Sequence, residues 1–187
     1  MIYNWKKIVR NGLPILTFAV LIEIFAGSIL QNNQEIIVLL PIFLISIPVI
    51  NSVGGNIGSV LGARLASGLH VGYITAKAND KKMHENLLTA IIIGVFTYTL
   101  LAIIIYYGAL FANLNKGIEL KEFVGIFVST GFLLICLVAI SSVLAAFISF
   151  KKGLDPDDMV APVVTTVGDV LGITFLFLMI SVFGVGI

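Results

Sequence analysis

The chain has 187 residues, of which 59% are hydrophobic and 11% are charged, whereas soluble globular domains average about 45–50% apolar and about 25% charged residues. This composition excludes a soluble globule of this size, and a formal net charge of +1 gives no basic field for nucleic acid. The apolar residues occur in runs of about 20, the length that a helix needs to cross about 30 Å of hydrocarbon. The sequence therefore predicts an all-α integral membrane protein.

Five transmembrane helices are predicted in chain order. Their expected ranges are 13–30, 36–61, 87–111, 123–150 and 160–187. The connectors between them are short and polar, and no long soluble segment remains for a second domain. We therefore expect residues 1–187 to form a single transmembrane domain.

The positions of the lysines and arginines predict the topology. Nine of the eleven lie in the amino terminus, the second connector or the fourth connector: Lys6, Lys7, Arg10, Arg64, Lys77, Lys81, Lys82, Lys151 and Lys152. Because positive flanks are retained inside the cell, we expect a multi-pass plasma-membrane protein with a cytoplasmic amino terminus and an external carboxyl terminus. An odd span count without an internal repeat leaves a two-fold homodimer as the default way to build a symmetrical pathway.

Two acidic residues fall well inside predicted spans, Glu23 in the first and Asp169 in the fifth. An ionised carboxylate in mid-helix costs about 2.5–3.5 kcal/mol on insertion scales, so such residues usually face a cavity, a partner or a cation path. No lysine or arginine is predicted at their depth. These two carboxylates are the first functional candidates.

The fifth predicted span combines oxygen ligands with small residues around Asp169. Ala161, Thr165, Asp169 and Gly172 lie along one side of a helix of 3.6 residues per turn. Thr166 adds a second hydroxyl next to this stripe. The alternative is a protonated Asp169 carboxyl that is hydrogen-bonded to a neighbouring helix.

The second predicted span is rich in small residues. They form two adjoining stripes, the first Gly54, Gly58 and Gly62, the second Gly55, Ser59 and Ala63. Small residues on one side of a helix let backbones approach closely in lipid, so these stripes could serve helix packing alone or line a pore. Asn51 and Asn56 add side-chain oxygens to the same segment. Pro41 and Pro48 are expected to bend this helix.

Three acids precede the fifth span. Asp155 is a predicted N-cap, followed by Pro156 at the first helical position and by Asp157 and Asp158 in the first turn. The same acids could line a cytoplasmic mouth below Asp169. The sequence has no phosphate-binding loop, no His-Glu-x-x-His pair and no nucleophile elbow, so no enzymatic activity is expected.

Two motifs together resemble a known family. The first is Pro48-x5-Gly54-Gly55-Asn56-x-Gly58-Ser59, followed by Arg64 and Gly68, and the second is Asp155-Pro156-x5-Pro162-Val163-Val164-Thr165-Thr166-x2-Asp169. They resemble the membrane domain of the MgtE magnesium transporters. The chain is more similar still to the single-module archaeal relatives of the eukaryotic solute-carrier magnesium transporters, in which Glu23-Ile24-Phe25-Ala26-Gly27 also has a counterpart.

The resemblance implies five helices per subunit, a homodimer, and a cation pore on the two-fold axis walled by the second and fifth spans. It also implies that Asp169 is the central ion-binding carboxylate. The chain lacks the large cytoplasmic sensor region of bacterial MgtE proteins, so regulation by that route is not carried over.

The expected function is transport of Mg²⁺, or of Mn²⁺ or another divalent cation. Asp169, Thr165, Thr166, Asn51, Asn56 and Glu23 are the expected ion-pathway residues. One alternative is a proton- or Na⁺-coupled transporter of another small solute that uses the two intramembrane acids for coupling. The other is a membrane assembly subunit without transport activity, in which the glycine stripes serve only packing.

Overall fold

The structure is a computed structural model that describes residues 5–77, 79–153 and 156–185, with side chains except at 5–8, 11 and 156–158. Within these ranges the chain is all-helical and contains no strand. The helices are α1 (Trp5–Asn32), α2 (Gln34–Leu39), α3 (Ile42–Val71), α4 (Lys81–Phe111), α5 (Leu120–Lys152) and α6 (Pro156–Val182).

Five of these helices are long and apolar enough to cross a membrane, which confirms the predicted number of spans. The segments are Gly12–Asn32, Ile42–Val71, Lys81–Phe111, Leu120–Lys152 and Met159–Val182. Many large apolar side chains on their outer sides are exposed, among them Phe18, Phe96 and Leu144. Such a surface suits hydrocarbon as its solvent.

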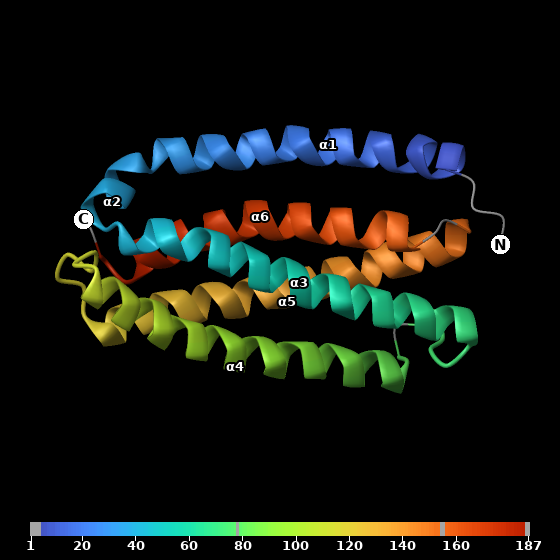
Figure 1. The fold of residues 1–187 in the computed structure, drawn as a ribbon. Helices are drawn as coiled ribbons and strands as arrows, with labels where there is room; N and C mark the ends of the chain where they lie inside the picture. Colours follow the sequence, from blue (N-terminus) through green and yellow to red (C-terminus); the bar gives the residue numbers. More distant parts are fainter. Residues whose placement is uncertain (1–4, 78, 154–155, 186–187) are drawn as a thin grey trace.

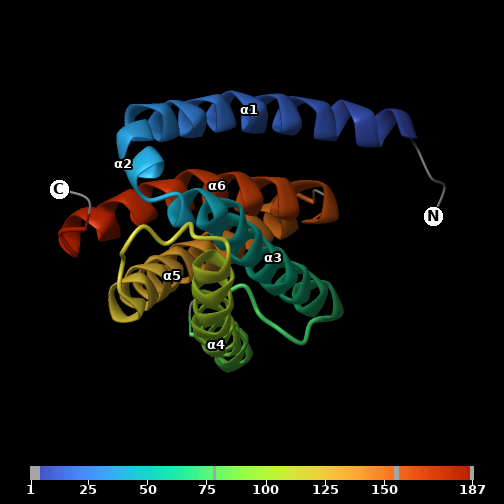
Figure 2. The same ribbon diagram turned by 60° about the vertical axis from the view of Figure 1, so that its left-hand side comes forward.

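The helices form a bundle in which α3, α5 and α6 pack against one another (Figure 1). Helix α4 covers the side made by α3 and α5, whereas α1 packs mainly against α6 and lies apart from α4 (Figure 2). The start of α1, the 72–80 loop and the start of α6 lie at the same end of the bundle (Figure 1). The basic segments of the sequence thus gather at one end of the bundle, and the orientation of that end towards the cytoplasm stays a prediction.

The second span differs from its predicted range of 36–61. Pro41, which has no backbone N–H, separates the short helix α2 from α3, so the chain breaks there instead of bending. Helix α3 then continues to Val71, because Leu65, Ala66 and Leu69 are buried against its neighbours. It ends at Gly72, whose φ of 75° is the left-handed conformation typical of a C-cap.

Three other helix ends differ from prediction by five residues or more. Helix α1 starts at Trp5 rather than at 13, α4 starts at Lys81 rather than at 87, and α6 ends at Val182 rather than at 187. Hydropathy marks where apolar side chains begin and end, whereas a helix continues through polar residues until a cap stops it. Gly184, with φ of 67°, follows the end of α6.

Gly54, Gly55, Gly58 and Gly62 of the α3 stripes lie inside the bundle, whereas Ser59 is half-buried and Ala63 is exposed. A side chain at Gly58 would collide with Val138 of α5 and Val164 of α6, and one at Gly62 would collide with Val160. Close packing alone is therefore sufficient to require glycine at these positions. Whether any of them also lines a pore stays a prediction.

Two hydrogen bonds join α3 to its neighbours within the apolar interior. The Tyr98 hydroxyl of α4 donates to the Ile50 backbone carbonyl at 2.7 Å, and the Ser142 hydroxyl of α5 donates to the Gly58 carbonyl at 2.8 Å. Both donors are fully buried. These bonds fix the depth of the glycine-rich segment relative to α4 and α5.

Asp80 organises the loop that connects α3 to α4. One carboxylate oxygen accepts from the Thr75 backbone N–H at 2.9 Å and from its hydroxyl at 2.7 Å, and the other accepts from the Met83 N–H at 3.0 Å. These bonds, the Thr75 N–H first, lower the pKa of Asp80 from 3.8 to about 2. Asp80 thus caps α4 and closes the loop with the same carboxylate.

This arrangement predicts that acid loosens the loop. Because the folded-state pKa lies below the ordinary one, the ionised carboxylate stabilises the loop above pH 3.8, and this contribution is lost as the pH falls towards 2. Amide-exchange protection at Thr75 and Met83, corrected for intrinsic rates, should therefore fall between pH 5 and pH 2. In Asp80→Ala it should be low at both pH values.

The Gly72 N–H, which bonds to the Leu69 carbonyl without a carboxylate partner, serves as the internal control. Equal protection of Thr75 and Met83 at both pH values in the wild type would contradict the assignment.

Candidate functional site

The predicted site residues of the second and fifth spans meet where α3 crosses α6. A Cβ atom at Gly55 would lie 3.2 Å from the Thr165 methyl group, and one at Gly168 would lie 3.6 Å from the Gly55 nitrogen. The two backbones are therefore nearly in contact. This close approach brings Asn51 of α3 beside Asp169 of α6.

Asn51 links the two helices at the level of Asp169. Its side-chain amide donates to the Asp169 backbone carbonyl at 3.3 Å. Its Oδ1 atom is buried and has no hydrogen-bond partner within the described part of the chain, and any side chain at Gly172 would overlap this atom. A buried amide oxygen without a donor is uncommon in native structures and calls for an explanation.

The Asp169 carboxylate is half-buried, and a second acid on the neighbouring helix α1 is close enough to interact with it electrostatically. Glu23 of α1 is exposed, and its charge repels that of Asp169. Neither carboxylate forms an ion pair among the described residues, where Lys82 and Glu85 make the one salt bridge. Two unneutralised acids on adjacent helices favour a cation between or near them.

The two threonine hydroxyls point in different directions. Thr165 lies at the crossing with α3, where its hydroxyl donates to the Ala161 carbonyl at 2.9 Å. Thr166 is buried on the other side, where it lines a cavity of about 170 Å³ between α1 and α6 and donates to the Pro162 carbonyl at 2.8 Å. A hydroxyl that donates still offers lone pairs, so both oxygens remain acceptors.

A polar strip on α3 borders the crossing. Ser52 and Asn56 are exposed and Ser59 is half-buried along one side of this helix. The Asn56 amide donates to the Ser52 hydroxyl at 3.3 Å. Because the adjacent Gly55 touches Thr165, the strip lies beside the α6 stripe that contains Asp169. The two polar surfaces therefore form one continuous face.

The acids of the predicted cytoplasmic mouth cannot be placed in this site. Asp155 lies outside the described residues, and the side chains of Asp157 and Asp158 lie outside them as well. Helix α6 does begin at Pro156, as the sequence predicts. Across the described residues, no group of three or more His, Cys, Asp or Glu side chains comes together to hold a metal ion.

Three residues that support this site were not identified from the sequence. Ser52 extends the polar strip, and Tyr98 and Ser142 hold α3 by hydrogen bonds to its backbone. A lone tyrosine in mid-span and a buried serine in α5 were the available signals. Neither could be assigned a partner before the helix order was known.

The contact of Asn51 with Gly172 yields a stability prediction. Gly172→Ala should lower the free energy of unfolding in detergent micelles by about 1–3 kcal/mol, the usual effect of overpacking. Asn51→Ala in the same chain should restore part of that loss, because it removes the atom with which the new methyl group collides.

Gly108→Ala is the matched control, since that glycine lies in a helix and has no atom within 4 Å of a built Cβ. A Gly172→Ala protein as stable as Gly108→Ala would show that the Asn51 amide is not held against Gly172.

Comparison with known proteins identifies the family. Residues 47–179 match the sequence model of MgtE, described as a divalent cation transporter. That range contains Asn51, the glycine stripes, Thr165 and Asp169, and it begins after α1. No curated protein and no solved structure matches the chain significantly. The match covers well over half of the chain, and the chain therefore belongs to the MgtE family of divalent cation transporters.

Proposed function

We propose that the chain conducts Mg²⁺ along the polar face formed by α3 and α6. The observation that carries this proposal is the meeting of Asn51, Thr165 and Asp169 at the glycine crossing, with Glu23 beside them. Mg²⁺ gives up its water reluctantly and is usually held by one or two carboxylates with several waters retained. One Asp169 carboxylate per chain, surrounded by hydroxyl and amide oxygens, suits such a hydrated ion.

The ion path requires a second copy of the chain. The polar strip of α3 and the Asp169 side of α6 are open at the surface of the single bundle, where lipid would otherwise contact them at a cost. A two-fold homodimer through this face would bury both strips and pair the Asp169 carboxylates. A monomeric mass in a membrane-like environment, combined with full flux, would overturn a shared path.

In this assembly the side chains take distinct roles. Asp169 binds the ion, Asn51, Asn56 and Thr165 accept hydrogen bonds from its waters, and Gly54, Gly55, Gly58, Ser59 and Gly62 allow the helices to approach. Thr166 faces α1 and lies outside this path. Asp155, Asp157 and Asp158 attract cations to the cytoplasmic mouth. The chain lies in the plasma membrane as a single domain over residues 1–187, with its amino terminus inside.

The family match disfavours the two alternatives but leaves Na⁺ or H⁺ coupling of cation flux open to experiment. A transporter of an organic solute would need a cavity for that solute beside Asp169. A cavity that borders α6 close to Asp169, between α1 and α6, is apolar. An assembly subunit would have no use for two unpaired intramembrane acids.

The central test removes the Asp169 carboxylate. Asp169→Ala in liposomes should lower Mg²⁺ flux about tenfold or more, because each 1.4 kcal/mol of lost ion binding weakens it about tenfold. Glu35→Gln, which neutralises an exposed acid at the start of α2, is the matched control and should keep wild-type flux. Wild-type Mg²⁺ flux in Asp169→Ala would rule the proposal out.

Glu23 should tune this site through its charge. Glu23→Gln should change both the Mg²⁺ flux and its pH dependence, because the repulsion that Glu23 exerts on Asp169 is removed. The measurement is flux into liposomes over a pH series. Unchanged flux with an unchanged pH profile would count against a role for Glu23.

A further inference from the structure

Two adjoining cavities lie between α3 and α4, on the side of α3 away from Asp169. The first has a volume of about 220 Å³, and its wall comes from both helices: Asn56, Ile57, Val60, Leu61, Arg64, Asn86, Thr89, Ala90 and Ile93. The second has a volume of about 530 Å³ and lies nearer the 72–80 loop: Ala63, Arg64, Ser67, Gly68, Val71, Tyr73, Ile74 and Asn86. Arg64 and Asn86 belong to both cavities.

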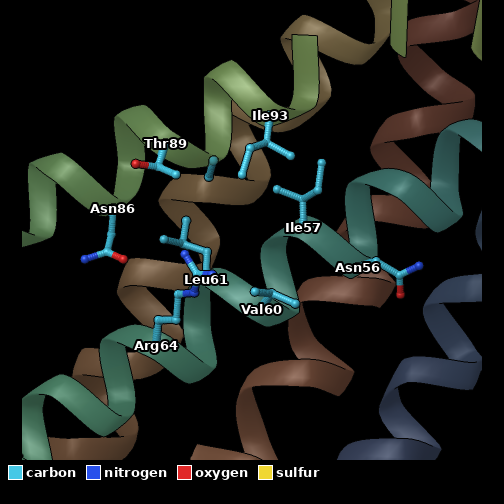
Figure 3. A pocket seen from close by; sticks show the side chains of 9 residues that line it. Asn56, Ile57, Val60, Leu61, Arg64, Asn86, Thr89 and Ile93 are labelled. Atoms are coloured by element: carbon cyan, nitrogen blue, oxygen red, sulfur yellow. The ribbon is translucent and has the colours of Figure 1, made fainter. Parts of the chain in front are cut away.

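The inner cavity is polar at one end only. Figure 3 shows Arg64 and Asn86 at one end and Ile57 and Ile93 at the other, while the Asn56 amide points away from the α4 side chains. The two ends are seven residues apart on each helix, from Ile57 to Arg64 on α3 and from Asn86 to Ile93 on α4. Seven residues span roughly 10 Å along a helix. The apolar chamber is therefore long and narrow, and it ends at a guanidinium group.

Arg64 has no internal role that accounts for it. Its side chain is exposed, and among the described residues it neither forms a salt bridge nor donates a hydrogen bond to another residue. Nearby side chains are already occupied, since Asn86 donates to the Lys82 carbonyl and Lys82 pairs with Glu85. A lone cation between two chambers, one apolar and one open and partly polar, complements an amphiphilic anion.

The position along the bundle also fits the level of lipid headgroups. Asn86 lies five residues after the start of α4, at the end of the bundle that carries Lys77, Lys81 and Lys82. Basic pockets between transmembrane helices at this level bind anionic headgroups. A headgroup bound here would give a role to Arg64, which belongs to the first sequence motif and has no role in the proposed ion path.

We propose that the α3–α4 cleft is a binding site for an anionic phospholipid, with one acyl chain in the inner cavity and the phosphate headgroup on Arg64 in the outer one. The side of α3 opposite the ion path is then covered by a specific lipid. Bound there, the lipid holds α4 against α3 and so supports the glycine-rich segment from the outside.

Native mass spectrometry of the purified protein tests the site with two lipids of the same acyl chains, phosphatidylglycerol and zwitterionic phosphatidylcholine. Wild type should bind phosphatidylglycerol more tightly. Arg64→Ala should weaken that binding on the order of fivefold and abolish the preference, since one basic group near the surface contributes about that factor. Arg10, the other arginine of the chain, lies outside both cavities. Arg10→Ala should therefore leave the binding of both lipids unchanged.

Val60→Phe fills the inner cavity without a change of charge, because Val60 lines it and is exposed. Val60→Phe should weaken the binding of both lipids equally. Arg64→Lys should retain part of the preference for phosphatidylglycerol. Unchanged thermal unfolding midpoints in the absence of lipid identify variants that are folded. Glycerol phosphate, a headgroup without chains, should not displace the lipid.

The proposal is overturned by equal binding of the two lipids to wild type or by full binding of phosphatidylglycerol to folded Arg64→Ala. It is also overturned by full binding to folded Val60→Phe, which would place the chain elsewhere, or by equal losses in Arg10→Ala and Arg64→Ala, which would indicate general charge attraction.

Discussion

The near contact of the α3 and α6 backbones at Gly55 and Gly168 is the constraint on which the rest of the site depends. In lipid, helices gain little from burying apolar side chains against one another, so close approach and complementary shape decide which helices associate. Glycine at the crossing allows that approach, and the surrounding valines of α5 and α6 occupy the space that larger residues on α3 would need. Asn51 reaches the Asp169 backbone because the helices are this close.

The bundle separates the two sides of α3 by chemistry. One side carries hydroxyls, amides and bare backbone towards α6, and the other carries the apolar wall of a cavity with a single guanidinium at its end. Asn56 stands at the boundary between them. Because α3 carries polar residues on two opposite sides, its apolar residues are spread around the helix axis. The sequence of α3 therefore does not show the pattern of an amphipathic helix.

Composition and charge were sufficient to predict the five spans and the two intramembrane acids, because both follow from the exclusion of charge from hydrocarbon. A bend was predicted at Pro41, where the structure has a break, because proline can bend a helix or end it according to what packs around it. The extra turns of α3 up to Val71 were missed because residues 64–71 mix polar and apolar side chains. Whether α3 continues through these residues depends on the neighbouring helices that bury Leu65 and Leu69.

The sequence could propose the members of the candidate site but not its geometry. The stripe of Thr165 and Asp169 followed from helical periodicity, yet periodicity could not assign Thr166 to the side facing α1 or reveal the Asn51 contact with Gly172. Tyr98 and Ser142 needed the packing of α4 and α5 on α3 before their roles could be recognised. Such residues act across helices that lie far apart in the sequence.

The mainly pairwise packing of α1 on α6 has a consequence for biosynthesis. Helix α1 is synthesised before α6, which is its principal partner, so α1 waits in the bilayer while α3, α4 and α5 are inserted. Glu23 and Asp169 are therefore brought together only after α6 has been synthesised. A chain synthesised only as far as α5 holds Glu23 without Asp169, so the proposed cation path cannot form before α6 is inserted.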